Sequence, residues 1–328
     1  MPIPCRAVLG GTALLSVALT LAACDAAYTS MGQGMAESSA RANAQRFAAQ
    51  GNPQFTEPAL QAVVKDFEAR YTEIGLDSEK LGMAQGKPCP ATKETAFQVL
   101  KGMSYADYRK MLDDVAAKVP SYTGATDLNA VQLVSLSGVC GETGPEGPAV
   151  VAGTTRDVTR YASDSNTTVT VSDTVSRIEG TWIDGQRSGS YTWILITRSA
   201  QFKPDDDGAL EVDVNDWAYV NEMREPPTAT YLYFVAGEGG KMKYTVTFSR
   251  NPVVGIYTTA VAERIDDVHA YSRSWQGTEL WQEGRTKNGM PHGWQTIHPT
   301  VYNGTQIPGQ RNCYQNGELI KALECPST

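Results

Sequence analysis

From about residue 128 to the C-terminus, apolar and polar residues alternate in short runs, and this period of two restricts the fold more than any other feature of the chain. Clusters of Gly, Pro and Asp separate the runs, and no long helical pattern lies between them, which disfavours parallel βαβ units. We therefore expect a large antiparallel β-sheet or sandwich-like domain with hairpins over 126–328. Its strands are predicted at 131–140, 169–175, 191–197, 231–235, 244–248 and 256–261.

A smaller helical segment is expected before the β-rich region, over 55–125. Thr56 is a typical N-cap residue, and Pro58 suits the first turn of a helix. Apolar residues then recur at helical spacing as far as Ile74. The sequence thus predicts a first amphipathic helix in this segment.

Two further short helices are predicted within the same segment. The helix that contains Phe97 is expected to end at Gly102. Ser104 is expected to begin the next helix, where Asp107 can complete a capping box, and Pro120 to end it. Small helices followed by a larger antiparallel sheet place the chain in the α+β class.

The N-terminus has the pattern of an export signal. Arg6 precedes an apolar run over 7–22, which is short for a membrane-spanning helix but fits the apolar region of a secretory signal, expected over 1–23. Residues 24–54 are rich in Ala, Gly, Ser, Gln and Asn and contain few large apolar side chains. We expect a flexible tether there, in which a short helix around 41–49 would have little to bury.

The signal ends in Leu21-Ala22-Ala23-Cys24, which resembles the lipobox of bacterial lipoproteins. The resemblance implies cleavage before Cys24 and attachment of diacylglycerol and a fatty acid such as palmitate, so that a lipid bilayer becomes a partner of the chain. Asp25 resembles an inner-membrane retention signal of some enteric bacteria, but this rule differs between lineages, so the inner and outer membranes both stay open. The alternatives are an ordinary signal peptide with a chance cysteine and an uncleaved anchor.

Six cysteines support an exported chain. Cys5 lies in the signal and Cys24 is the expected lipid attachment site, which leaves an even number of thiols at Cys89, Cys140, Cys313 and Cys325. An even number in an exported chain suggests two disulfides with three possible connectivities. We favour Cys89 with Cys140 and Cys313 with Cys325, because this pairing closes the shortest loops.

Two segments share one glycine pattern. Glycines are separated by five and then four positions in both, and a turn dipeptide, Asp-Gly or Asn-Gly, contains the middle glycine. Nearby aromatic residues could pack across the strands and over the glycines. The segments resemble the β-hairpin repeat of the MORN type, which implies a scaffold that contacts lipid or protein and carries no catalytic residue; two unrelated hairpins with similar turns are the alternative. The residues concerned are Gly180, Trp182, Gly185 and Gly189 in the first copy and Gly284, Gly289, Gly293 and Trp294 in the second, while Asn303-Gly304 and Asn316-Gly317 are candidates for degenerate copies.

Residues 102–108, Gly-Met-Ser-Tyr-Ala-Asp-Tyr, resemble a helix-start motif of small outer-membrane assembly lipoproteins of the SmpA/OmlA type. The similarity covers only these positions, and the capping residues alone account for a helix start there. It therefore adds to the lipoprotein interpretation and assigns no further role.

The composition and the motif search argue against several functions. The formal charge is −8 and no long basic run occurs, which disfavours nucleic acid as a partner. Neither His-Glu-x-x-His, Gly-x-Ser-x-Gly nor Ser-x-x-Lys is present, and the histidines are only His269, His292 and His298. We therefore expect no catalytic, metal or cofactor residue.

Two functions from different classes follow. The first is a membrane-anchored lipoprotein of the bacterial envelope, non-catalytic, whose β-rich domain, in the periplasm or at the surface, binds or scaffolds an envelope protein or glycan. The second is an envelope hydrolase that acts on glycan or peptide through a carboxylate pair that only the folded structure would bring together.

Overall fold

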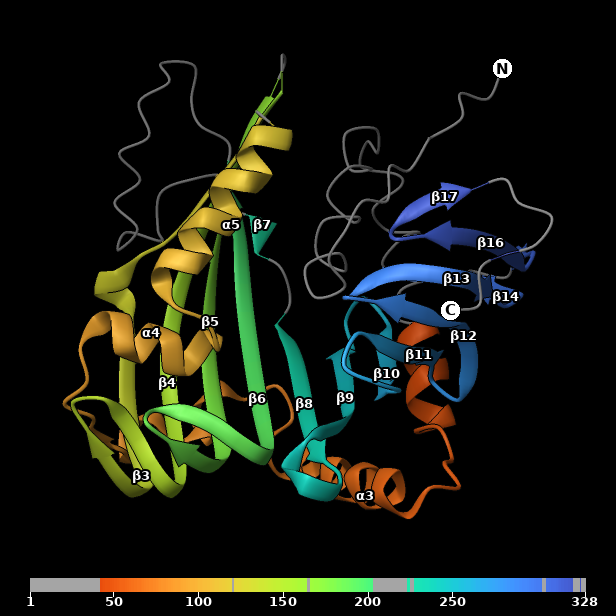
Figure 1. Cartoon of the computed structure of the whole chain (residues 1–328). Helices are drawn as coiled ribbons and strands as arrows, with labels where there is room; N and C mark the ends of the chain where they lie inside the picture. The colour runs from red at the N-terminus through yellow and green to blue at the C-terminus, as the bar shows by residue number, and fades with distance from the viewer. Residues whose placement is uncertain are drawn as a thin grey trace. The chain divides into compact units, whose positions relative to one another are not determined.

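The computed structural model describes residues 42–119, 121–163, 166–202, 223–224, 227–302, 305–320 and 325. Within these residues the chain is α+β and rich in antiparallel strands (Figure 1). It divides into two compact units. Of the described residues, unit 1 holds 42–61, 242–248 and those from 252 onward, and unit 2 holds 62–241 and 249–251, so the β-rich region that we expected as one domain is shared between the units.

Unit 2 is built on a sheet of long antiparallel strands. Its order is β1-β3-β4-β5-β6-β8, with β2 beside β4 and β7 beside β6. Only residues 142–143 form the turn between β3 and β4, so the glycine- and proline-rich segment 141–148 lies mostly in these strands. The strands are β1 (Lys87–Pro88), β2 (Tyr122–Thr126), β3 (Gln132–Gly141), β4 (Gly144–Ser163), β5 (Asn166–Ile183), β6 (Gln186–Phe202), β7 (Met223–Arg224) and β8 (Thr228–Ala236).

Two helices, α4 (Lys93–Lys101) and α5 (Tyr105–Lys118), lie in front of this sheet in Figure 1. Phe97 of α4 is fully buried in a core that it shares with Val151 and Ile178 of the sheet. Helices, and not a second sheet, thus cover this face of unit 2, which differs from the sandwich-like arrangement that we expected. The fold buries the apolar face of α4 against strand residues that lie far away in the sequence.

The predicted end of α4 and the predicted start of α5 are confirmed, whereas Pro120, the expected end of α5, lies outside the described residues. Gly102 ends α4 in the left-handed conformation, with φ 75°, and its N–H donates to the carbonyl oxygen of Gln98. The Ser104 hydroxyl accepts a hydrogen bond from the N–H of Asp107 at 3.1 Å and so caps α5. These contacts satisfy backbone groups that would otherwise lack partners at the helix ends.

Helix α3 (Pro58–Ile74) begins one residue later than the sequence suggested. The carbonyl oxygen of Glu57 accepts the first helical hydrogen bond, from Gln61, at 3.0 Å, so Glu57 occupies the N-cap position. The Thr56 hydroxyl donates instead to the Glu57 carboxylate, at 3.2 Å. The apolar stripe of α3 is confirmed, since Phe67 is 2% exposed.

The unit 2 part of α3 is fixed by aromatic and ionic contacts. The ring of Phe67 lies edge-on to Tyr231, with centroids 5.2 Å apart. The guanidinium of Arg70 bonds to Glu179 of β5 at 2.9 Å and to Asp66 at 2.6 Å. Burial acts to raise the pKa of the Glu179 carboxyl, but the bonds from Arg70 and Arg177 hold this pKa below its usual value.

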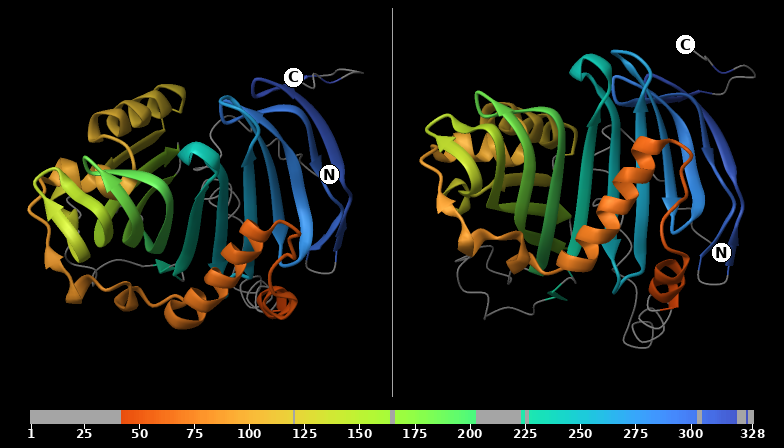
Figure 2. Two further views of the ribbon diagram at one scale, coloured as in Figure 1. Left: turned by 60° about the horizontal axis from the view of Figure 1, so that its bottom comes forward. Right: turned by 90° about the horizontal axis from the view of Figure 1, so that it is seen from below.

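In unit 1 the sheet order is β9-β10-β11-β12-β13-β16-β17, so successive strands of the chain are neighbours except where β14 and β15 intervene between β13 and β16 (Figure 2). A separate ribbon pairs β14 with β15. Such a meander needs only short turns between its strands. The strands are β9 (Met242–Asn251), whose last three residues belong to unit 2, β10 (Ile256–Arg264), β11 (His269–Gln276), β12 (Glu279–Lys287), β13 (Met290–Ile297), β14 (Thr300–Tyr302), β15 (Thr305–Ile307), β16 (Gln310–Gln315) and β17 (Glu318–Ile320).

The expected flexible tether is ordered in its second half. Residues 42–50 form a helix, in which Phe47 is 5% exposed. Arg46 and Gln50 both donate to the carboxylate of Glu279, at 2.6 Å and 2.9 Å. The strand residue that accepts these bonds lies more than 200 residues away in the sequence, so local composition does not reveal it. Residues 24–41 lie outside the described residues.

Candidate functional site

The two hairpins with the shared glycine pattern have the predicted turns. Asp184 and Gly185 have φ angles of 50° and 70°, and Asn288 and Gly289 have 50° and 78°. Positive φ at both central residues is the signature of a type I′ turn. The turn at Asn316-Gly317 has the same signs, with 50° and 90°, whereas Asn303-Gly304 lies outside the described residues.

The two hairpins also share one register shift. In the first, Gly180 pairs with Tyr191 while the next residue, Thr181, pairs with Ser188. In the second, Gly284 pairs with Gln295 while Thr286 pairs with Pro291. The third glycine of each copy lies inside the shift and has a positive φ, 66° at position 189 and 78° at position 293.

The first glycine of each copy lies beneath a side chain of the partner strand. A Cβ atom on Gly180 would be 2.6 Å from the Cβ of Tyr191, and one on Gly284 would overlap the side-chain amide of Gln295. Positive φ at the second and third glycines of both copies, and close approach to Tyr191 at Gly180, are backbone reasons for glycine, whereas the side-chain amide over Gly284 could move aside. The second copy departs from our expectation, because the side chain over its glycine is Gln295 and not Trp294.

The first hairpin is anchored to the helical side of unit 2. Trp182 is 1% exposed and its indole N–H donates to the carbonyl oxygen of Ala149 at 3.4 Å. The Arg187 guanidinium donates to the carbonyl oxygens of Val99 and Leu100, at 2.7 Å and 3.2 Å, and lies over the ring of Trp193. Burial lowers the pKa of Arg187. In the second hairpin the guanidinium of Arg311 lies over the ring of Trp294, with the Arg311 Cζ atom 4.3 Å from the ring centroid.

The predicted disulfide pairing is confirmed. Cys89 bonds to Cys140 and Cys313 to Cys325, with Cα–Cα distances of 5.5 Å and 5.7 Å. The first joins the segment next to β1 to the end of β3, and the second fixes the residue after the last strands of unit 1. All four cysteines downstream of position 24 are therefore paired, while Cys24 itself lies outside the described residues.

The segment 102–108 has a structural role at the junction of α4 and α5. The rings of Tyr105 and Tyr108 each lie 5.2 Å from Phe97. The Tyr108 hydroxyl points to Asp157, and burial followed by the charge of Asp157 raises the pKa of Tyr108 to about 12. These residues thus join two helices to the sheet.

The three histidines of the chain all lie in unit 1, and two of them are neighbours. The rings of His269 and His292 have centroids 6.2 Å apart, and the Nε2 atoms of both are buried without a partner. His269 Nδ1 contacts the Asp266 carboxylate at 2.8 Å, and His292 Nδ1 accepts the N–H of Asn316 at 3.3 Å. With Nδ1 as an acceptor, the neutral His292 ring carries its proton on Nε2, which leaves no lone pair there for a metal.

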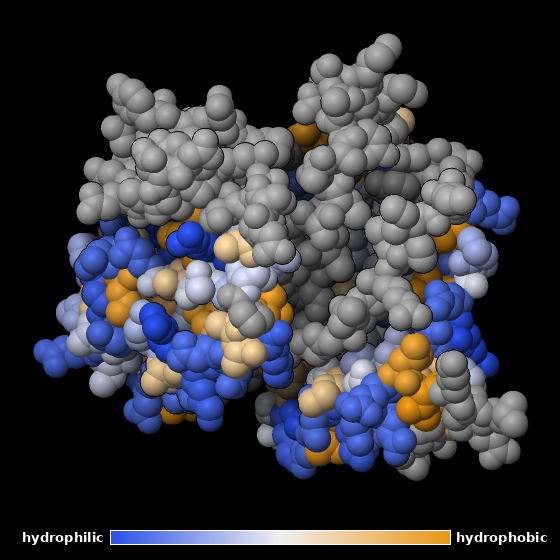
Figure 3. All heavy atoms as spheres, turned by 90° about the horizontal axis from the view of Figure 1, so that it is seen from above, coloured by the Kyte–Doolittle hydropathy of each residue, from blue (hydrophilic) through white to orange (hydrophobic). Residues whose placement is uncertain are grey.

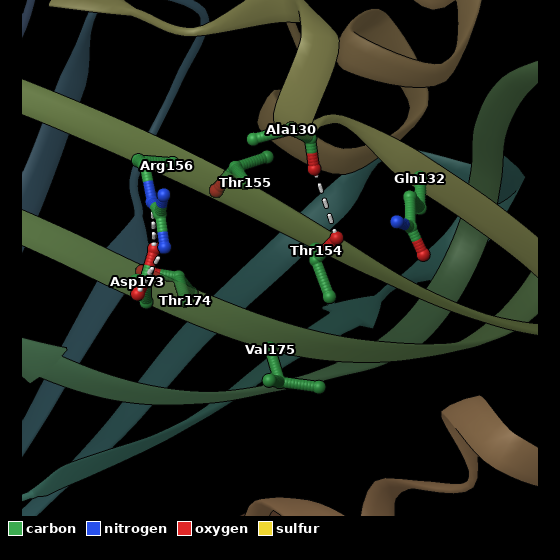
Figure 4. Close-up of a pocket in the computed structure, with 8 residues that line it drawn as sticks. All are labelled: Ala130, Gln132, Thr154, Thr155, Arg156, Asp173, Thr174 and Val175. Atoms are coloured by element: carbon green, nitrogen blue, oxygen red, sulfur yellow. Dashed lines mark hydrogen bonds and ion pairs between the residues drawn. The ribbon is translucent and has the colours of Figure 1, made fainter. Parts of the chain in front are cut away.

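A pocket of about 350 Å³ with polar and apolar lining lies in unit 2, where β3, β4 and β5 run side by side (Figure 4). Its main interaction is a fork between Arg156 and Asp173, which pair across β4 and β5 at 2.6 Å and 3.0 Å. The hydroxyl of Thr154 donates to the carbonyl oxygen of Ala130 at 3.0 Å. The pocket is lined by Ala130, Gln132, Thr154, Thr155, Arg156, Asp173, Thr174 and Val175.

None of these lining residues was singled out in the sequence. They come from three strands and the turn before β3, and only the pairing register brings Gln132, Thr154 and Val175 into one row. No local spacing signals such a row, because each strand contributes residues in the ordinary period of two. The pocket therefore arises from the pairing register of the three strands.

Exposed large apolar side chains do not single out a docking face among the described residues. They are spread over both units, from Val139, which is 69% exposed, to Leu319, at 62%. On the face that Figure 3 shows, hydrophobic and hydrophilic residues are interspersed. Scattered exposed apolar residues are normal for folded proteins.

The described residues contain no group of three or more His, Cys, Asp or Glu side chains that could hold a metal ion. None of the described helices combines the length and the apolar character that a membrane crossing requires. In comparisons with known proteins, no family model, no curated protein and no solved structure matches the chain.

Proposed function

We propose that the chain is a lipid-anchored lipoprotein of the bacterial envelope and that its β-sheet units are a non-catalytic binding or scaffold module for an envelope partner. In this proposal, acylated Cys24 holds the protein at a bilayer, and the folded part lies in the periplasm or at the surface. The destination membrane is either the inner or the outer one.

The observation that carries the proposal is the use of the cysteines. The cysteine of the lipobox-like segment ends the signal, and every cysteine downstream of it forms a disulfide. Disulfides persist in oxidising compartments and are rare in the cytosol. A single cysteine left for a lipid, at the end of an export signal, is what an exported lipoprotein needs.

The paired hairpins support the scaffold part of the proposal. They repeat the same turn and the same register shift at equivalent positions, which favours the MORN-type interpretation over two unrelated hairpins. Most glycines of the pattern are needed for backbone geometry, and aromatic and Arg side chains near the hairpins contact the protein's own chain. In this interpretation the hairpins support a binding surface and do not perform chemistry.

Lipid labelling tests the anchor. A bacterial host that produces the chain is fed a fatty acid with a chemical handle, and the labelled protein is compared with Cys24→Ala. We expect label only on the unaltered chain, and a shift to the unprocessed precursor when the lipoprotein signal peptidase is inhibited. Normal labelling of Cys24→Ala would refute the anchor, and Cys5→Ala serves as the matched control.

Crosslinking in the native envelope, followed by identification of what co-purifies, tests the module. A specific envelope protein or glycan is expected. If the purified chain instead cleaves envelope glycan or peptide, and a single Asp→Asn or Glu→Gln change abolishes the cleavage, the hydrolase is the correct function.

A further inference from the structure

The pocket between β3, β4 and β5 has a lining with a definite chemical character. Among its polar groups are the hydroxyl of Thr154, the amide of Gln132, and the fork between Arg156 and Asp173, which the strand pairing places on one face of the sheet. It includes no aromatic ring, no histidine, no cysteine and no lysine among its lining residues. A ligand there is recognised through hydrogen bonds.

The charges of the lining cancel. The guanidinium of Arg156 is bound by both carboxylate oxygens of Asp173, and this contact is the largest cause of the raised pKa of Arg156. An anion would meet the carboxylate of Asp173, and a cation would meet the guanidinium of Arg156. A charged ligand therefore gains little from this lining, because one member of the ion pair repels it. A neutral polar ligand meets no such repulsion.

The lining offers both hydrogen-bond donors and acceptors. The amide of Gln132 offers both kinds of group from an exposed side chain. The hydroxyl of Thr154 donates to Ala130 and can still accept. A ligand that matches this lining must itself donate and accept from several neighbouring atoms, which is the property of vicinal hydroxyl groups.

The pocket is large enough to hold a sugar ring. A volume of about 350 Å³ lies near the lower end of the usual range for small-molecule sites. The methyl groups of Val175 and the threonines offer apolar contacts for the C–H groups of such a ring.

We propose that this pocket binds one neutral sugar residue of an envelope glycan. The proposal rests on the proposed function, because it names the glycan, and not a protein, as the envelope partner. It does not depend on the lipid, so a failure of lipidation and a failure of sugar binding are separate results.

The test uses the purified Cys24→Ala chain and four monosaccharides at pH 6. Glucose and N-acetylglucosamine are neutral, glucuronate is an anion, and glucosamine is a cation. Saturation-transfer NMR and calorimetry are expected to show that a neutral sugar binds with a dissociation constant of about 1 mM, as a ligand of this size usually does. The charged sugars are expected to bind at least about threefold more weakly.

Substitutions locate the site. Gln132→Ala and Thr154→Val are each expected to weaken binding of the neutral sugar by about three- to tenfold, the effect of one hydrogen bond. Gln186→Ala is a matched exposed control and Thr159→Val a matched half-buried control, and both are expected to leave binding unchanged. Circular dichroism checks that each variant is folded.

Three results would overturn the proposal. The first is no binding of either neutral sugar at concentrations well above 1 mM. The second is equal or tighter binding of a charged sugar. The third is neutral-sugar binding that neither pocket substitution weakens, which would place the sugar elsewhere on the chain.

Discussion

A Cβ atom on Gly185 would overlap the carbonyl oxygen of Thr143, which lies in the tight turn between β3 and β4. The corresponding glycine of the second hairpin, Gly289, has nothing within 4 Å of its Cβ position. The two turns have nearly the same φ angles, 70° and 78°, so they separate the effect of backbone strain from the effect of close packing.

We expect Gly289→Ala to lower the free energy of unfolding by about 1–2 kcal/mol, the cost of an L-residue at positive φ. Gly185→Ala carries the same strain and the overlap with Thr143, so we expect a loss above about 2 kcal/mol. Denaturant unfolding followed by circular dichroism measures both. Asn tolerates positive φ, so Gly289→Asn should be less destabilising than Gly289→Ala. Gly185→Asn should be as destabilising as Gly185→Ala, because the overlap with Thr143 remains. Equal losses at the two positions would contradict the packing argument.

Removal of the two disulfides should have unequal effects. The Cys89–Cys140 bond closes a separation of 51 residues and the Cys313–Cys325 bond one of 12. On the loop-entropy model these contribute about 4 and about 3 kcal/mol. We therefore expect the double Ser variant at 89 and 140 to melt at a lower temperature than the variant at 313 and 325. The opposite order would show that loop entropy does not dominate here.

Arg187 should stabilise unit 2 through the end of α4. Its guanidinium satisfies the carbonyl oxygens of Val99 and Leu100 and lies 4.1 Å from the centroid of Trp193. Arg187→Met should cost about 1.5–3 kcal/mol, because it leaves helix-end carbonyls without a donor. Arg187→Lys should rescue it only in part, since an ammonium cannot lie flat on the indole. Thermal unfolding measures these changes, with exposed Arg160→Met as the control that should stay within about 0.5 kcal/mol.

The features that the sequence predicted correctly depend on nearby residues. Ser104 and Asp107 are three positions apart, and the Asp-Gly and Asn-Gly dipeptides specify their own turns. Their chemistry is complete within one turn of helix or one hairpin, so no tertiary contact is needed to recognise them. The disulfide pairing was likewise favoured by short separation along the chain.

The features that the sequence missed depend on distant partners. The helix at 42–50 was expected to have little to bury, but Phe47 is buried and Arg46 bonds to Glu279. The pocket required the register between three strands, so Gln132 and Asp173 could not be associated beforehand. Neither the distant partner of the 42–50 helix nor the strands that form the pocket can be recognised from the local sequence pattern.

The turn before β11 should depend on pH through Asp266. Its carboxylate accepts the N–H groups of Val268 and His269, both at 2.8 Å, and these bonds together with the His269 ring lower the pKa of Asp266 to about 2. In the unfolded chain the ordinary value is 3.8, so the unfolded state takes up the proton first as the pH falls. The stabilisation is therefore complete above about pH 4 and disappears as the pH falls towards 2.

Asp266→Asn tests this dependence, because the amide oxygen can still accept both N–H groups but does not titrate. The difference in melting temperature between the unaltered chain and Asp266→Asn should be constant above about pH 4 and should shrink between about pH 4 and pH 2. The effect should be small, since the carboxylate is exposed to solvent and screened. Asp267→Asn, one position away and with its side chain 77% exposed, is the control, and its variant should keep the acid dependence of the unaltered chain. Parallel curves for the unaltered chain and Asp266→Asn across this range would show that Asp266 does not stabilise the turn through its charge.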